Sequence, residues 1–317
     1  MKSRKAILTS PRHFEIIEED VSAEPGQVLV KTAVCGLCNW ELNHWKGLLG
    51  NYPQTLGHEW SGEIVILGEG VEGFKAGDMV TGLTSVLNAF SDYAVYNASD
   101  CHKINQNVKP IYALGEPLKC IVTVLKATAP TFGDYGVVFG CGPMGLWCIQ
   151  GLTGNMLSGL IAVDIDDDKL ALAKKFGANY TINPKRDNVE EKIREISDGN
   201  MADFAIEGTG SPSVVNNAIS CLKSGRGRLI LMSSYESEAA PINLKMAMEK
   251  AIEVKVAHPG YSNNQGDDMR RAVAALNNEV FKNQDIISHV FSLNEIQKAF
   301  ETLENKPLGY LKGIVIP

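Results

Sequence analysis

The sequence predicts an α/β protein with two domains, one rich in strands and one built on a doubly wound parallel sheet. Its 317 residues, 44% of them hydrophobic, suffice for two ordinary cores. Strand-like runs divided by turn residues extend to about residue 105, and short apolar runs alternate with helical segments after about residue 120. We therefore expect one domain from residues 1–120 and 258–317, and a second from residues 121–257.

The first domain is expected to be partly barrel-like. Gly, Pro, Asn and Asp separate its β-favouring runs, as turns require. These runs cover residues 1–9, 26–31, 61–68 and 91–96. Near the other end of the sequence, a helical run at 293–300 and a strand-like run at 313–316 are expected to return to this domain.

The second domain shows the rhythm of a parallel sheet. A helical run at 169–177 carries lysines in its last turn and a glycine at its end, which is typical of a helix C-terminus. Alternation of strands and helices predicts a doubly wound sheet. Its expected strands cover residues 136–139, 160–163, 204–206 and 228–231.

A glycine pattern between the first expected strand and the following apolar helix predicts a dinucleotide site. The pattern is Gly140-Cys141-Gly142-Pro143-Met144-Gly145. With 30 glycines in 317 residues the spacing alone is weak, and an ordinary strand-to-helix turn is the alternative. Asp164 ends the next strand, where a carboxylate accepts the ribose hydroxyls of NAD and repels the extra phosphate of NADP. We therefore expect NAD, with Asp166, Asp167 and Asp168 either adding to this repulsion or starting a solvated helix.

A second group of residues predicts a metal site in the strand-rich domain. Cys35 and Cys38 have the spacing of half a zinc ribbon, but the sequence has no second Cys-x-x-Cys pair to complete it. His58, Glu59 and Glu116 supply the other expected ligands. One thiolate, one imidazole and one or two carboxylates make an open catalytic site.

Five motifs in order give the sequence a family resemblance along nearly its whole length. It resembles the zinc-dependent medium-chain alcohol dehydrogenases, and within them it is most similar to the sorbitol and polyol branch. The resemblance implies a GroES-like catalytic domain beside a Rossmann domain. The motifs are Gly36-Leu37-Cys38, Gly57-His58-Glu59, Gly77-Asp78-Met79-Val80, Glu116-Pro117-Leu118 and the glycine pattern at 140–145.

The resemblance also assigns roles to single residues. Cys38, not Cys35, and His58 are implied as zinc ligands, with Glu59 and Glu116 binding directly, alternating or acting through water. Lys169 is implied to reach the adenosine ribose, and Lys312 the pyrophosphate. The implied activity is hydride transfer between NAD and a secondary alcohol of the polyol, sugar or cyclitol class, with one catalytic zinc per chain.

Two departures from the family pattern stand out. The four-cysteine lobe of a second zinc is missing, because residues 81–90 run straight into the next expected strand. Trp40-Glu41 stands where the family has Ser or Thr followed by Asp. An indole cannot relay a proton, so the substrate proton would leave through zinc-bound water, Glu59 or His44, the last of which matches a substrate-pocket position. Trp40 is then either a pocket wall or, like Trp45, a core residue.

Two other functions compete with this interpretation. A zinc-free quinone or enone reductase of the same superfamily lacks the cysteine and Gly-His-Glu set that is present here. A non-catalytic nucleotide-binding redox sensor could keep the fold alone. Metal analysis and a test for NADH production separate the three.

The bulk properties point to a small alcohol or carbonyl compound as the partner. A net charge of −7 without blocks of like charge argues against nucleic acid and anionic membranes. The apolar stretch at 137–149 is too short to span a bilayer. Seven scattered cysteines and the lack of a signal-like start predict a cytoplasmic protein. The resemblance implies a homodimer or homotetramer.

Overall fold

The computed structural model divides into two compact units. Unit 1 comprises Met1–Lys119 and Gly266–Pro317, and unit 2 comprises Cys120–Gln265. The first boundary lies one residue before the expected one, and the second follows residue 265 instead of residue 257. The structure describes residues 1–83, 86–154, 156–235, 241–258 and 261–317.

Unit 1 contains two sheets among its described residues. The smaller has the order β2-β1-β4, and the larger has the order β15-β16-β3-β5-β6-β8, with β7 also paired to β3. The strands are β1 (Lys2–Ser10), β2 (His13–Asp20), β3 (Gln27–Gly36), β4 (Gln54–Thr55), β5 (Glu59–Leu67), β6 (Met79–Gly82), β7 (Tyr93–Asn97), β8 (Cys101–Lys103), β15 (Ile287–Ser292) and β16 (Lys312–Ile316). The direct run expected at 81–90 includes residues 84 and 85, which lie outside the described residues.

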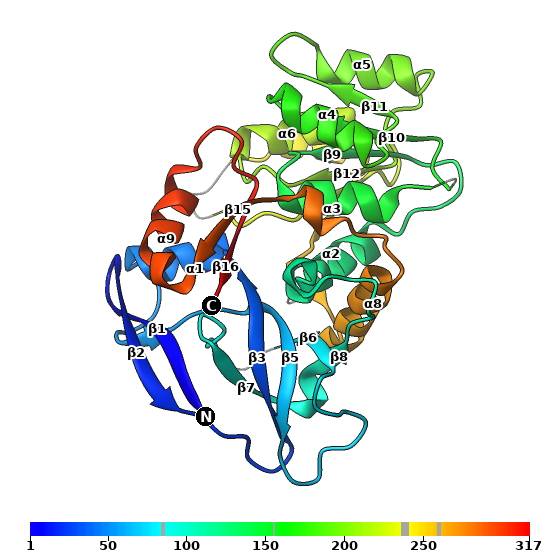
Figure 1. Cartoon of the computed structure of the whole chain (residues 1–317). Coiled ribbons are helices and arrows are strands. Elements are labelled where there is room, and N and C mark those ends of the chain that lie inside the picture. The colour runs from blue at the N-terminus through cyan, green and yellow to red at the C-terminus, as the bar shows by residue number, and fades with distance from the viewer. Residues whose placement is uncertain (84–85, 155, 236–240, 259–260) are drawn as a thin grey trace. The chain divides into compact units, whose positions relative to one another are not determined.

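Helices of unit 1 lie in the connections between these strands (Figure 1). The α-helices are α1 (Asn39–Lys46), α2 (Gly115–Thr128), which crosses the boundary to unit 2, α8 (Gln265–Asn277) and α9 (Ile296–Asn305). Short 3-10 helices are η1 (Ala98–Asp100), η2 (Pro110–Tyr112), η4 (Asn283–Asp285) and η5 (Leu293–Glu295).

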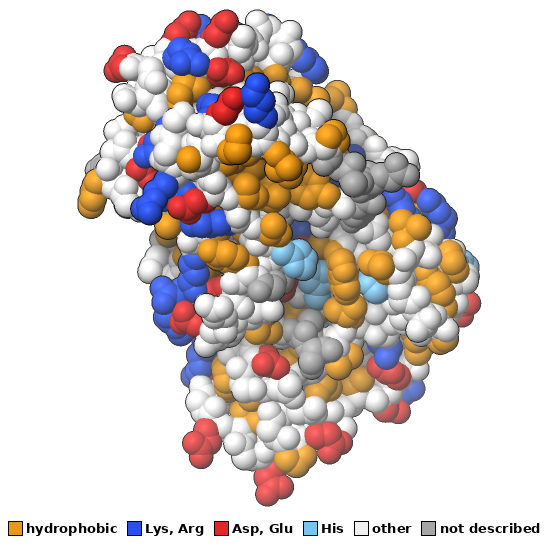
Figure 2. Space-filling view, turned by 180° about the vertical axis from the view of Figure 1, so that it is seen from behind, with side chains coloured by type: hydrophobic (Ala, Val, Ile, Leu, Met, Phe, Trp, Pro, Cys, Tyr) orange, Lys and Arg blue, Asp and Glu red, His pale blue; other side chains and the backbone are white. Residues whose placement is uncertain are grey.

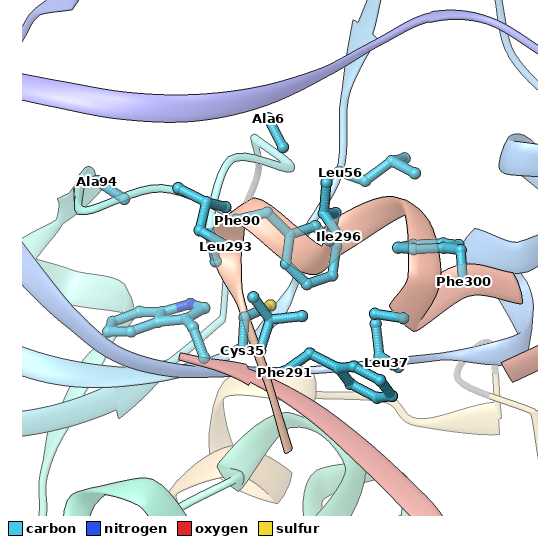
Figure 3. Close-up of a cluster of buried hydrophobic side chains, with 14 of the residues drawn as sticks. Ala6, Cys35, Leu37, Leu56, Phe90, Ala94, Phe291, Leu293, Ile296 and Phe300 are labelled. Carbon is cyan, nitrogen blue, oxygen red and sulfur yellow. The ribbon is translucent and has the colours of Figure 1, made fainter. Parts of the chain in front are cut away.

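The core of unit 1 joins residues that are far apart in the sequence. The Phe300 ring of α9 packs against Phe14, Phe90 and Trp45, with ring centroids 5.0, 5.8 and 6.1 Å apart. Cys35 is fully buried in the same cluster, which Figure 3 shows beside Leu37 and Phe291. Burial raises the pKa of the Cys35 thiol well above its usual value. Cys35 is therefore a packing residue.

Unit 2 contains a six-stranded parallel sheet in the order β11-β10-β9-β12-β13-β14. The strand order reverses between β9 and β12, which is the switch point where such folds bind ligands. The predicted doubly wound sheet is confirmed. Its strands are β9 (Tyr135–Phe139), β10 (Gly159–Val163), β11 (Tyr180–Ile182), β12 (Phe204–Glu207), β13 (Arg228–Leu231) and β14 (Glu253–Val256).

Helices connect the parallel strands, as crossover connections require. Figure 1 shows α3, α4, α5 and α6 arranged around the sheet. The helices are α3 (Pro143–Leu152), α4 (Asp167–Lys175), α5 (Val189–Ile196), α6 (Pro212–Cys221) and α7 (Leu244–Lys250). The helical run predicted at 169–177 thus corresponds to α4, which begins two residues earlier than predicted.

The surface matches the even charge pattern of the sequence. On the face in Figure 2, acidic and basic side chains are interspersed and neither sign forms a broad patch. No helix in the described part of the chain has the length and apolar character needed to cross a bilayer.

Candidate active site

Three predicted ligands meet where β3 ends and β5 begins. Cys38 is the N-cap residue of α1, just after β3, while His58 and Glu59 stand at the start of β5. Antiparallel pairing of the two strands sets Gly36 opposite Glu59. One potential ligand atom each from Cys38, His58 and Glu59 lies within 4.8 Å of the others. The geometry therefore brings a thiol, an imidazole and a carboxylate to one point.

The Glu59 carboxylate occupies a space that a larger neighbour would fill. A Cβ atom on Gly36 would lie 2.1 Å from Glu59 Oε2, so this position requires glycine. Glu59 is 2% exposed, and burial raises the pKa of its carboxyl group more than Lys312 and His58 lower it. The Gly36-x-Cys38 motif thus makes room for the carboxylate as well as placing the thiol.

Lys312 is held in this cluster, which the sequence did not predict. Its Nζ lies 2.5 Å from Glu59 Oε2 and donates to the carbonyl oxygen of Leu37 at 2.8 Å. Burial alone would lower the pKa of Lys312, but the negative charges of Glu59 and Cys38 raise it by a larger amount. The ammonium group therefore stays charged. The pyrophosphate role implied by the resemblance stays a prediction, because the contacts of Lys312 that the structure shows are with the metal cluster.

Glu116 reaches the other side of the imidazole from the first turn of α2. Its Oε2 lies 3.8 Å from His58 Nε2, and its Oε1 accepts from Lys119 Nζ at 2.8 Å. Burial would raise the pKa of Glu116, but His58 and Lys119 lower it more, so the carboxylate is ionised. Both predicted carboxylates therefore lie near the ligand set, and each is paired with a buried lysine.

Glu41 is a site residue that sequence reasoning missed. It is fully buried, and its Oε1 lies 2.8 Å from His58 Nδ1 and accepts from the Gly57 amide at 2.6 Å. A carboxylate on Nδ1 fixes the imidazole so that Nε2 becomes the ligand atom. The available signal was its place on the α1 helix, three residues after Cys38.

This donor set fits a divalent cation. When the thiol is ionised, Cys38, Glu41, Glu59 and Glu116 carry four negative charges, whereas the two paired lysines carry two positive charges. Buried charge must be neutralised nearby. A divalent ion balances the cluster, and mixed sulfur, nitrogen and oxygen ligands are those that zinc takes in proteins.

Trp40 lies against the cluster instead of inside the core. It is 44% exposed, and its ring centroid lies 5.6 Å from that of His58 and 4.5 Å from that of His44. Trp45, in contrast, is 1% exposed and packs against Phe300. The core alternative is therefore wrong for Trp40 and right for Trp45. Trp40 forms a wall that joins two imidazoles.

The glycine turn of unit 2 has one open position. Gly140 has φ +91°, which favours glycine, and a Cβ on Gly145 would lie 1.9 Å from the Gly140 carbonyl oxygen. A Cβ on Gly142 would meet nothing within 4 Å, so packing within the protein does not demand glycine there. Helix α3 starts at Pro143 with no side-chain cap. The amides of this first turn, which includes Met144, and the space at Gly142 fit a pyrophosphate.

Asp164 joins this turn to the next strand. Its carboxylate accepts from the Cys141 amide at 2.7 Å and from the Asp166 amide at 2.9 Å. Asp166 in turn caps α4, and Lys169 Nζ lies 3.8 Å from Asp166. The acidic run at 166–168 thus starts a helix. Asp164 lies in the β10–α4 connection and Lys169 in the first turn of α4, near where the ribose was expected.

Two family models match the chain. Residues 24–115 match the alcohol dehydrogenase GroES-like domain, and residues 143–278 match the zinc-binding dehydrogenase domain. These matches fall on the metal cluster and on most of the nucleotide unit.

Similar proteins include several curated dehydrogenases. The L-threonine 3-dehydrogenase of Pyrococcus abyssi is 31% identical over 76% of this chain and 78% of its own length. The sorbitol dehydrogenase of Halalkalibacterium halodurans is 26% identical over 92% of this chain and 93% of its own. Among solved structures, the 2R,3R-butanediol dehydrogenase of Bacillus subtilis has a TM-score of 0.87 at 24% identity, over 99% of both chains.

Proposed function

Because this chain belongs to the family of zinc-binding alcohol dehydrogenases, we propose that it transfers a hydride between NAD and a secondary alcohol of the polyol, sugar or cyclitol class. The observation that carries the proposal is the convergence of Cys38, His58 and Glu59, whose potential ligand atoms lie within 4.8 Å. A zinc-free reductase would not need these three metal-ligating side chains. A non-catalytic redox sensor would bind the nucleotide without using them.

In the proposed site, Cys38, His58 and Glu59 would hold the zinc, with Glu116 as the alternative carboxylate ligand. Bound zinc supplies a Lewis acid that lowers the pKa of the substrate hydroxyl. Glu41 keeps His58 oriented, and the two lysines hold the carboxylates in place. The Trp40 indole N–H can only donate, so Glu59 is the group of the cluster that takes up the substrate proton.

On the cofactor side, Gly142 lets the pyrophosphate approach the amides at the start of α3. Asp164 accepts the ribose hydroxyls and disfavours the 2′-phosphate of NADP. A bound nicotinamide would supply the hydride acceptor, while the chain orients the two reactants. These roles of single residues are part of the proposal.

A substrate screen tests the proposed function. Zinc-loaded protein is mixed with NAD or NADP and a panel of polyols, cyclitols, amino alcohols and simple secondary alcohols, and NADH or NADPH formation is followed. We expect the highest kcat/KM for a polyol with NAD. Equal rates with NADP would refute the role of Asp164, and turnover confined to amino alcohols or to simple alcohols would refute the substrate class.

We further propose that the chain forms a homodimer or homotetramer through the β14 end of the unit 2 sheet. On β14, which ends the sheet, Val254 and Val256 are 47% and 60% exposed, and on α7 Leu244 and Met248 are each 74% exposed. Such apolar edges are typical of association sites. We expect light scattering to show an oligomer that Val256→Lys dissociates; an unchanged mass would move the interface elsewhere.

A cytoplasmic location is also proposed. All seven cysteines are free in the structure, which suits a reducing compartment. Cell fractionation with an antibody tests this, and recovery of the chain outside the cytoplasm would contradict it.

A further inference from the structure

His44 and Gln54 form a buried polar pair beside the metal cluster. His44, on α1, is 9% exposed, and its Nδ1 lies 2.9 Å from Gln54 Oε1 on β4. An amide oxygen only accepts, so Nδ1 carries the proton and Nε2 is a bare acceptor. Among the described residues, neither His44 Nε2 nor Gln54 Nε2 has a hydrogen-bond partner.

The side on which the two groups bond to each other is closed. A Cβ on Gly50 would lie 2.5 Å from Gln54 Oε1, 2.7 Å from His44 Nδ1 and 2.8 Å from Gln54 Nε2, so Gly50 packs closely against the pair, including one side of the amide nitrogen. The Tyr52 hydroxyl donates a hydrogen bond to the main-chain carbonyl of His44 at 2.6 Å and so holds this part of α1 in place. The pair is therefore fixed, and what remains unused is the other ring nitrogen and the amide nitrogen.

The unused atoms define the chemistry of an occupant. They comprise one acceptor and one donor, and turning the Gln54 amide merely exchanges the two roles. A hydroxyl group satisfies both, because it donates and accepts. A carboxylate or phosphate oxygen only accepts and leaves the bare nitrogen unpaired, and a methyl group satisfies neither.

Trp40 links this pair to the reaction site. Its indole lies against the His44 ring on one side and the His58 ring on another, at centroid distances of 4.5 and 5.6 Å. The two imidazoles thus share one wall, and an indole face suits the carbon skeleton of a polyhydroxy compound.

We propose that His44 and Gln54 bind a hydroxyl of the substrate other than the one that is oxidised, and so select diols and polyols over mono-alcohols and anionic substrates. This inference rests on the proposed function, whose substrate class it explains. The two residues act as specificity-determining groups and have no part in the hydride transfer itself.

The test compares alcohols that share a carbon skeleton. Butane-2,3-diol and butan-2-ol, with erythritol and sorbitol as larger probes, are oxidised by zinc-loaded wild-type, His44→Phe and Gln54→Leu protein. We expect kcat/KM for the polyhydroxy probes to fall about 10- to 100-fold in both variants, while that for butan-2-ol changes less than about 3-fold. Gln297→Leu on α9 is the matched control and should behave as wild type.

The readout that carries the inference is the ratio of the two kcat/KM values, because a general structural defect lowers both together. Zinc content and the NADH dissociation constant are measured for each variant alongside. An unchanged ratio overturns the inference while leaving the proposed function intact. A wild-type protein that oxidises none of the probes contradicts the proposed function first and the inference with it.

Discussion

The metal cluster of unit 1 and the glycine turn of unit 2 are built from opposite kinds of group. Within the cluster, buried ionisable side chains hold one another through short contacts, such as Glu41 with His58 and Lys312 with Glu59. The turn instead consists of main-chain amides and of positions without side chains. The first site should therefore be sensitive to changes of charge, and the second to changes of volume.

The largest effect is expected from removing one ligand of the cluster. Cys38→Ala should lose its zinc and lower kcat/KM by at least about 1,000-fold, because the remaining groups no longer make a complete set. Metal analysis and NADH formation measure the two losses. As control, Cys35→Ala should lose stability from the core but keep both zinc and rate. A Cys38→Ala protein with full zinc content would overturn the ligand assignment.

The next effect tests volume in the glycine turn. Gly142→Val should weaken NADH binding about 100-fold, because its side chain occupies the space that we assign to the pyrophosphate. The free energy of unfolding should change by less than about 1 kcal/mol, since the new side chain displaces no protein atom. Fluorescence titration and thermal unfolding measure the two quantities. Gly145→Ala, whose Cβ would meet the Gly140 carbonyl, should instead destabilise the fold. If Gly142→Val destabilises the fold as well, the glycine at 142 serves packing and not the cofactor.

A smaller effect is expected one contact away from the metal. Glu41→Gln keeps the shape but removes the charge that orients His58, and should weaken zinc about 10-fold. Competition with a chelator measures this. Glu63→Gln, on the same strand as Glu59 but exposed, serves as a control for the loss of one negative charge. Equal zinc affinity in wild type and Glu41→Gln would show that charge matters less in the cluster than we argue.

The smallest effect concerns a charged pair of unit 2 that lies outside its site. Asp134 accepts from Arg228 at 2.8 Å and from Thr131. Burial would raise the pKa of Asp134, but Thr131 and Arg228 lower it more. The carboxylate thus stabilises the fold at pH values above its unfolded pKa of about 3.8, and this contribution is lost as the pH falls through the lowered folded value.

Asp134→Asn should therefore cost about 1 kcal/mol of unfolding free energy at neutral pH and reduce the acid sensitivity of unfolding below about pH 4. Thermal unfolding between neutral and acid pH measures both, while NADH binding should be unchanged. A variant as acid-sensitive as wild type would show that this pair does not contribute.

The sequence predicted the regular parts of the fold because they follow local rules. The strand before the glycine turn and the strand that ends at Asp164 are apolar runs of the right length, and β9 and β10 coincide with them. The membership in the zinc-binding alcohol dehydrogenases is likewise confirmed. Local residue patterns and the order of the motifs in the sequence were sufficient to predict these features.

Contacts between residues far apart in the sequence could not be predicted from local patterns. Lys312 meets Glu59 only because β16 pairs with β3, which itself pairs with β5. Trp40 and Trp45 share one helix, but a separation of five residues places them about 140° apart around its axis, so only one of them can face the core. The sequence does not reveal which side of the helix is buried. Nor does it reveal that the side chains of Gln54 and His44 lie within hydrogen-bond distance of each other.

The division of unit 1 into two segments has a consequence for how the protein is made. Unit 2 is inserted between Lys119 and Gly266, so a ribosome completes the nucleotide unit before β16 exists. Until then Glu59 lacks the ammonium of Lys312 and the β3 edge lacks its partner. The metal cluster is thus complete only once Lys312 has been synthesised, after all of unit 2, although its expected metal ligands precede that unit in the chain.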